Sequence, residues 1–245
     1  MENSNWNNQR QASRSGSTFS HGTSHVEAAS RVFMQHVYGW MTLGLLITAL
    51  FAYLTFNSEF LFSIVSGMGI WALIIAELGL VFVISGMINK LSPLAAKGLF
   101  ALYSALNGLT LSVILMAYTQ SSVYSTFLIT AGTFGLMSVY GMVTKKDLTN
   151  LGSLLMMGLV GIIIASLVNV FIGSSGLSMI ISYVGVLIFT GLVAYDTQKL
   201  KNISYSVSSV GAGNASKMAI LGALSLYLDF INLFIMLLRV LGNRR

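Results

Sequence analysis

The stretch KMAILGALSLYLDFINLFIMLLRVL, from Lys217 to Leu241, decides the fold. It exceeds the run of about 20 apolar residues that a helix needs to cross a bilayer. Small and polar residues recur in it at helical spacing and share one face: Gly222, Ser225, Asp229 and Asn232. Such a stripe among Leu, Ile, Phe and Met should face protein rather than lipid. The stretch therefore predicts a transmembrane helix that is central in its bundle.

Six further apolar runs of spanning length precede it, at residues 36–56, 69–89, 95–117, 123–143, 151–172 and 177–197. Over the whole chain 55% of the residues are hydrophobic, only 8% are charged, and the mean hydropathy is +0.80. Strands of a membrane barrel would instead alternate in hydropathy over about ten residues. The sequence therefore predicts an all-α integral membrane protein with seven transmembrane helices over residues 31–245.

The first 30 residues differ from the rest, being rich in Asn, Ser, Gln and Gly. This composition cannot build a core and predicts a disordered polar tail. Lys and Arg occur in this tail and in the second, fourth and sixth connectors, whereas the first, third and fifth connectors have none. By the positive-inside rule, the N-terminus is expected to be cytoplasmic.

Three arginines near the C-terminus, Arg239, Arg244 and Arg245, would lie on the opposite side if the chain crosses seven times. The last segment either crosses fully or re-enters and returns. Its length favours a full crossing.

Glycines in the later spans predict close helix packing, which small residues permit in membranes. They are Gly132, Gly135, Gly158, Gly161, Gly185 and Gly191.

Two carboxylates, Asp196 and Asp229, lie inside the sixth and seventh predicted spans. Burying a charge at bilayer depth costs about 3 kcal/mol or more, so such residues usually have a function or a partner. If they meet, one proton shared between them would make a pH sensor and gate, and a cation could pass between them when the proton leaves. Alternatively, Asp196 is a headgroup-level carboxylate neutralised by nearby lysines, and Asp229 is a protonated core acid.

Other polar residues could belong to a pore or polar face: Glu77, Asn107, Ser225 and Asn232. Glu77 is either an outer stop for a cation or a glutamate bonded to a neighbouring helix. For Asn107, hydrogen bonding between helices is the ordinary expectation.

Five stretches, in order, resemble the Bax inhibitor family in its bacterial branch, over residues 31–241. They are Val37-Tyr38-Gly39-Trp40-Met41, Ala76-Glu77-Leu78-Gly79-Leu80-Val81, Asn107-Gly108-Leu109-Thr110-Leu111-Ser112, Ala194-Tyr195-Asp196-Thr197-Gln198 and Leu226-Tyr227-Leu228-Asp229-Phe230-Ile231-Asn232-Leu233-Phe234. The resemblance implies a multi-pass protein of the bacterial inner (plasma) membrane, with the seventh helix inside a ring of the others.

The same resemblance implies a pH-dependent calcium leak governed by Asp196 and Asp229, which would bind the ion only transiently. In the family a basic residue of the second helix pairs with the sixth-helix aspartate, and Lys90 is the nearest candidate here. The connector from Lys201 to Lys217 is long for the family and rich in Ser and Gly.

Two other classes of function compete with a channel. An intramembrane aspartyl protease would need Gly-x-Gly-Asp where this chain has Leu226-Tyr227-Leu228-Asp229. The sequence also has no cysteine that could act as a thiol nucleophile. We therefore expect neither an enzyme nor a cofactor. A non-transporting regulator could use the N-terminal tail to bind and modulate a membrane-bound protease or another membrane protein. The expected partners are thus the lipid bilayer, calcium ions, protons and, in the regulator case, a protein; the scattered basic residues do not indicate nucleic acid.

Overall fold

The structure is a computed structural model that describes the backbone of residues 3–245 and the side chains of residues 26–207 and 209–245. Seven helices in this part are long and apolar enough to cross a membrane, as the sequence predicts. The elements in order are α1 (Asn3–Phe56), α2 (Glu59–Val65), α3 (Gly69–Met87), the 3₁₀ turn η1 (Ile88–Lys90), α4 (Pro93–Met116), α5 (Gln120–Val143), α6 (Thr149–Ile172), α7 (Ser175–Ser206), the 3₁₀ turn η2 (Val207–Ser209) and α8 (Ala212–Leu241).

Local sequence signals place several of these helix ends. The hydroxyls of Ser92, Thr119 and Ser174 accept hydrogen bonds from backbone amides of the first turns of α4, α5 and α7. Pro93 follows Ser92 at the first position of α4, where its missing amide hydrogen has no cost. Gly173 ends α6 with a φ of +67°, a left-handed conformation that glycine adopts readily.

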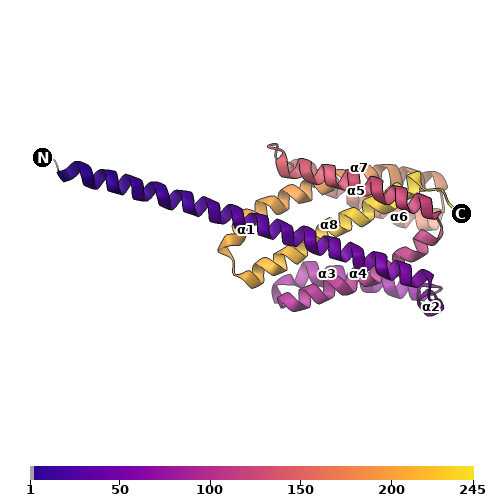
Figure 1. The fold of residues 1–245 in the computed structure, drawn as a ribbon. Helices are drawn as coiled ribbons and strands as arrows, with labels where there is room; N and C mark the ends of the chain where they lie inside the picture. Colours follow the sequence, from indigo (N-terminus) through magenta and orange to yellow (C-terminus); the bar gives the residue numbers. More distant parts are fainter. Residues whose placement is uncertain (1–2) are drawn as a thin grey trace.

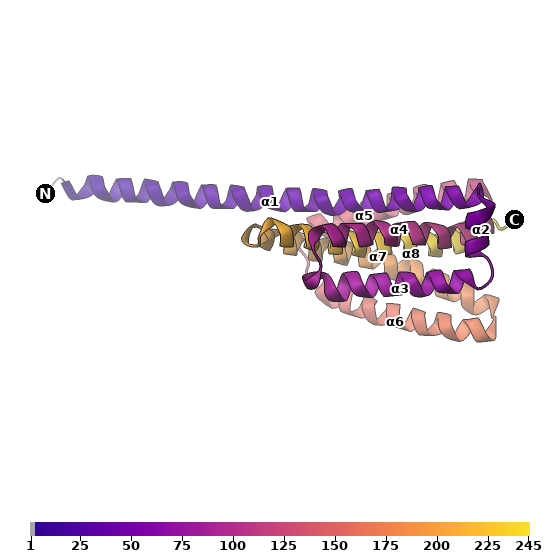
Figure 2. The same ribbon diagram turned by 90° about the horizontal axis from the view of Figure 1, so that it is seen from below.

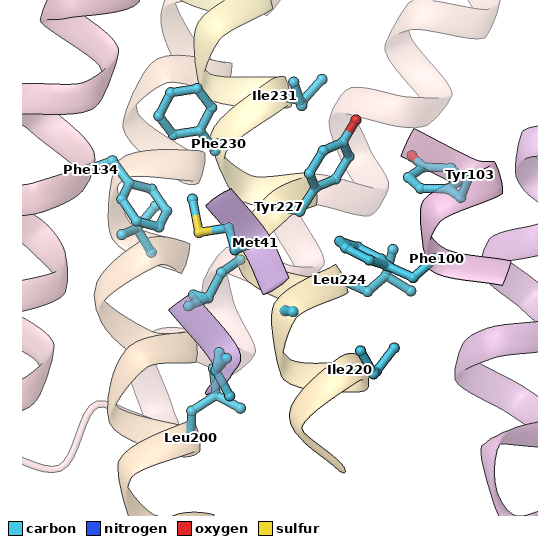
Figure 3. Close-up of a cluster of buried hydrophobic side chains, with 14 of the residues drawn as sticks. Met41, Phe100, Tyr103, Phe134, Leu200, Ile220, Leu224, Tyr227, Phe230 and Ile231 are labelled. Carbon is cyan, nitrogen blue, oxygen red and sulfur yellow. The ribbon is translucent and has the colours of Figure 1, made fainter. Parts of the chain in front are cut away.

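The spanning helices lie side by side, and α8 runs obliquely across the bundle (Figures 1 and 2). In its most apolar window 72% of the residues of α8 are buried, against 6% in α3 and in α6. Helices α1, α4, α5 and α7 all pack on α8. Figure 3 shows apolar side chains of α8, among them Phe230, together with side chains of neighbouring helices such as Phe100 and Leu200. Of the seven candidate spans in the described residues, α8 is thus the most buried.

The C-terminal residues decide between a full crossing and a re-entrant last segment. The amide of Thr119 donates to the carbonyl oxygen of Asn243 at 3.0 Å, and the amide of Arg245 donates to that of Ala117 at 3.0 Å. The Arg244 guanidinium lies 5.9 Å from the centre of the Tyr118 ring. Helix α8 thus crosses the whole bundle and ends beside the connector between α4 and α5.

The connector between the last two spans is much shorter than the sequence suggested. Helix α7 continues to Ser206 and α8 begins at Ala212, so the segment from Lys201 to Lys217 is mostly helical. Hydropathy locates the apolar part of a helix, whereas the helix itself continues into the polar headgroup level.

Helix α1 also extends beyond its apolar part. It begins at Asn3 and its N-terminal portion projects away from the bundle (Figure 1), although composition predicts a disordered tail over residues 1–30. Extending an existing helix avoids the unfavourable nucleation step that a separate helix would need. The cytoplasmic location of this segment stays a prediction.

Three of the six predicted glycines, Gly158, Gly185 and Gly191, lie against side chains of neighbouring helices, whereas contacts with a neighbouring helix backbone occur at other glycines. A Cβ atom at Gly108 would lie 2.5 Å from the carbonyl oxygen of Thr48, so α4 approaches the backbone of α1 there. Gly141 lies against the backbone of Ala194 in the same way, joining α5 to α7. By contrast, a Cβ atom at Gly132 would meet no atom of the described chain within 4 Å. Spacing alone does not tell which face of a helix meets protein.

Candidate functional site

Asp196 and Asp229 come together between α7 and α8. Their side chains are close enough for a hydrogen bond between the two carboxyl groups. On straight parallel helices the two residues would lie at different depths. Helix α8 is oblique in the bundle (Figure 1), so each of its residues adds less depth along the bundle axis. The two carboxyl groups therefore form one site, built from the helices that the sequence singled out.

Asp196 has two further partners. The hydroxyl of Ser225, one turn before Asp229 on α8, donates to Oδ2 of Asp196 at 2.6 Å. Lys199, one turn after Asp196 on α7, supplies a positive charge nearby. Asp196 and Lys199 also line a cavity of about 110 Å³ between the two helices, together with Gly222 and Ser225. Asp196 is thus the member of the pair that can be approached from this cavity.

Asp229 lies deeper and has fewer partners. Only 6% of the residue is exposed, and its Oδ2 atom is buried without a hydrogen-bond partner in the described chain. Ionised carboxylates only accept hydrogen bonds, so a hydrogen bond between Asp196 and Asp229 requires a proton on one of them. Without that proton, two like charges would face each other in a water-poor interior. The arrangement can therefore respond to the gain or loss of a single proton.

The pair offers few oxygen ligands for calcium, which takes about six to eight. No group of three or more His, Cys, Asp and Glu gathers within the described residues. The two carboxyl groups and the Ser225 hydroxyl could supply part of a coordination shell, with water completing it. This donor set fits an ion in transit better than a tightly held one.

Lys90, the expected counter-ion of Asp196, lies elsewhere. It is exposed at the end of η1, beyond α3. Lys199 is the lysine whose charge acts on Asp196. A lysine at i+3 on the same helix faces the aspartate by helical geometry alone, whereas Lys90 sits past the end of its helix.

Glu77 joins a separate polar network. The hydroxyl of Thr110 donates to its Oε1, and Nδ2 of Asn107 donates to its Oε2 at 3.4 Å. Of the two sequence interpretations, bonding to a neighbouring helix is therefore observed. Asn107 makes the hydrogen bonds between helices that its position predicts.

The network continues through Tyr227 into the centre of the bundle. The Tyr227 hydroxyl donates to Oδ1 of Asn107 at 3.1 Å and lies 2.6 Å from Oγ1 of Thr48. The ring of Tyr227 is fully buried and meets Phe100 and Tyr103 edge-on, at 5.8 and 5.7 Å between ring centres (Figure 3). One hydrogen-bonded chain thus links α3, α4, α8 and α1.

Sequence reasoning did not identify Tyr227 and Thr48 as parts of a site. Both lie in apolar runs. The one sequence signal was that each carries a hydroxyl, which needs a hydrogen-bond partner when it is buried among apolar residues. Asn232 continues the polar face of α8 but is partly exposed. It takes part neither in the hydrogen bond to the aspartate pair nor in those of the Tyr227 network. Of the four residues proposed for a polar face, Ser225 contacts the aspartate pair, and Glu77 and Asn107 belong to the second network.

Comparison with known proteins adds the family. The family model described as inhibitor of apoptosis-promoting Bax1 matches residues 30–245. The inner membrane protein YbhL of Escherichia coli K12 is 53% identical over 222 residues, which cover 89% of this chain and 94% of YbhL. An uncharacterized protein of Borreliella burgdorferi is 53% identical over 87% of this chain and 92% of its own length. Another, from Deinococcus radiodurans, is 47% identical over 88% and 91%.

Proposed function

The chain belongs to the Bax inhibitor family, and we propose that it is a pH-sensitive calcium leak channel in which Asp196 and Asp229 form the gate. We place it in the bacterial inner membrane, where the name of its relative YbhL places that protein, with its N-terminus in the cytoplasm. We propose no catalytic role. The observation that supports the channel best is a pair of adjacent carboxyl groups on two neighbouring spans, one of them buried with an unpartnered oxygen.

The gate works through the shared proton. With a proton between Asp196 and Asp229, the hydrogen bond holds α7 and α8 together. Loss of the proton leaves two charges that repel each other or admit a cation between them. Either change displaces α8 relative to α7. The Ser225 hydroxyl keeps Asp196 oriented toward α8 during this exchange.

An ion can pass only if α8 moves, because apolar side chains fill the space toward the C-terminal end of this helix. Phe230 packs edge-on against Phe127 and Phe134 of α5, with ring centres 5.6 and 5.5 Å apart. Phe234, one turn further, packs against Phe127 at 6.3 Å. A hydrophobic constriction of this kind stops ions until it is opened and hydrated. We therefore assign the structure to a closed state.

Calcium flux into dye-loaded liposomes tests the proposal. Purified protein is scanned from about pH 5 to 8, the range in which a coupled carboxyl pair can titrate. Flux from the parent protein should change with pH. Asp196→Asn and Asp229→Asn keep the size of each side chain but cannot share a proton between two carboxyl groups, so each should lose the pH response.

Asp147→Asn is the matched control. Asp147 lies in the connector between α5 and α6, where hydrogen bonds from the hydroxyl and the amide of Thr149 lower its pKa below the ordinary value. A lowered pKa keeps this exposed carboxylate ionised throughout the scan, so its replacement should leave the pH response intact. Absence of flux from folded parent protein at every pH would rule out the channel.

A second candidate function is a non-transporting regulator that binds another membrane protein. The projection of the N-terminal part of α1 away from the bundle favours it, because such a segment is free to meet a partner (Figure 2). Removing that segment separates the two candidates.

A further inference from the structure

A groove separate from the aspartate pair shares no lining residue with the cavity beside Asp196. Its volume is about 580 Å³, and it lies between α1, α4 and the start of α8. Alanines form much of its wall: Ala28 and Ala29 from α1, and Ala212, Ala215 and Ala219 from α8. This volume lies in the range of small-molecule sites, about 300–1,000 Å³. Apart from His36, Trp40, Lys97 and Ser216, the lining is aliphatic or aromatic hydrocarbon, which suits an acyl chain.

One end of the groove carries a positive charge. Lys97, in the first turns of α4, is half-buried there, and its Nζ lies 5.7 Å from the centre of the Trp40 ring. No carboxylate lines the groove, and Lys97 forms no salt bridge within the described residues. Tryptophan and lysine side chains are favoured at the headgroup level of a membrane. The groove therefore combines a largely apolar wall with a cation that has no salt-bridge partner among the described residues.

We propose that this groove binds one anionic phospholipid, with the phosphate at Lys97 and an acyl chain along the alanine wall. Basic pockets between transmembrane helices bind acidic lipid headgroups in this manner. The lipid would contact α1, α4 and Val207 of the connector between α7 and α8 at once. The proposal does not depend on ion conduction.

Fluorescence of Trp40 tests the site directly. The double change Trp6→Phe and Trp71→Phe leaves Trp40 as the one tryptophan of the chain. The protein is reconstituted in phosphatidylcholine vesicles that contain an equal minor fraction of either brominated phosphatidylglycerol or brominated phosphatidylcholine. The anionic quencher should be enriched about five-fold at Trp40 over the zwitterionic one, which is the preference expected from one basic residue at a membrane surface.

Variants distinguish the groove from general surface charge. Lys97→Gln and Lys97→Ala should abolish the preference, and Ala215→Phe, which fills the groove, should reduce quenching by either lipid. Lys90→Ala, an exposed lysine that does not line the groove, should leave the preference unchanged. Each signal is compared with the same variant in unbrominated vesicles, since loss of Lys97 alters the Trp40 environment.

Three results would overturn the proposal. They are equal quenching by the two lipids, a preference that survives both Lys97 changes, and displacement of the quencher by soluble glycerol phosphate. The last result would identify a free anion rather than a lipid as the ligand.

Discussion

The hydroxyl of Tyr227 is a polar atom in the most apolar part of the bundle. It bonds Asn107 of α4 and Thr48 of α1, and Asn107 in turn bonds Glu77 of α3. Polar groups buried in a membrane protein are satisfied by other helices, so each such bond fixes the rotation of two helices relative to each other. The network therefore sets how α8, which also carries Asp229, is oriented in the bundle.

Tyr227→Phe keeps the buried ring and removes this hydroxyl. We expect the protein to lose about 1 kcal/mol of stability, the usual value of a hydrogen bond between membrane helices. Tyr183→Phe is the control, because Tyr183 is on the exposed face of α7. Unfolding midpoints of both variants in detergent check the prediction, and equal midpoints would show that the network does not stabilise the bundle.

At this scale the sequence draws attention to the two aspartates more readily than to the Tyr227 network. Asp196 and Asp229 are conspicuous because a carboxylate in an apolar run is costly, and the helical stripe around Asp229 already contained Ser225. Tyr227 has an apolar body and carries no such penalty, so its polar role depends on contacts across helices. The sequence named Lys90 as the charge partner of Asp196, whereas Lys199 is the lysine near it. The reason is similar, since a charge partner depends on three-dimensional position.

Helix pairs are the next scale, and glycines let two of these pairs approach backbone to backbone. At Gly108, α4 approaches the backbone of α1 so closely that a methyl group would contact the carbonyl oxygen of Thr48. Small residues at such points let membrane helices gain van der Waals contact that larger side chains prevent. This contact also holds Thr48 near Tyr227.

Gly108→Ala should therefore destabilise the protein by about 1 to 3 kcal/mol, the cost of overfilling a packed interior. Gly132→Ala should change stability by less than about 0.5 kcal/mol, because a Cβ atom there meets open space. Unfolding of both variants in the same detergent provides the measurement. A neutral Gly108→Ala would mean that α1 and α4 can separate without loss.

Helix number and approximate span limits follow from the sequence, because the length of an apolar run is a local property. The helix ends outside the apolar runs do not. Residues from Lys199 to Ser206 are polar enough to end a hydropathy window, yet they continue α7. The apparent long connector came from treating the limit of the membrane as the limit of the helix.

At the scale of the whole molecule, the chain has two parts: the helix bundle and the N-terminal part of α1. The N-terminal part of α1 projects beyond the other elements (Figures 1 and 2). The aspartate pair, the proposed aromatic constriction and the polar network are all built from residues of the spanning helices. A leak that depends on these parts should not require the projecting segment.

Deleting residues 2–25 tests this division. The truncated protein should conduct calcium in liposomes with the same pH response as the full chain, because the proposed gate between α7 and α8 lies outside the deleted segment. Adding Asp229→Asn to the truncation should remove the pH response, which shows that the same gate operates. If the truncated protein unfolds at the same midpoint as the full chain but loses flux, the segment takes part in conduction. If neither form conducts, while only the full chain binds a membrane protein partner, the regulator is the correct function.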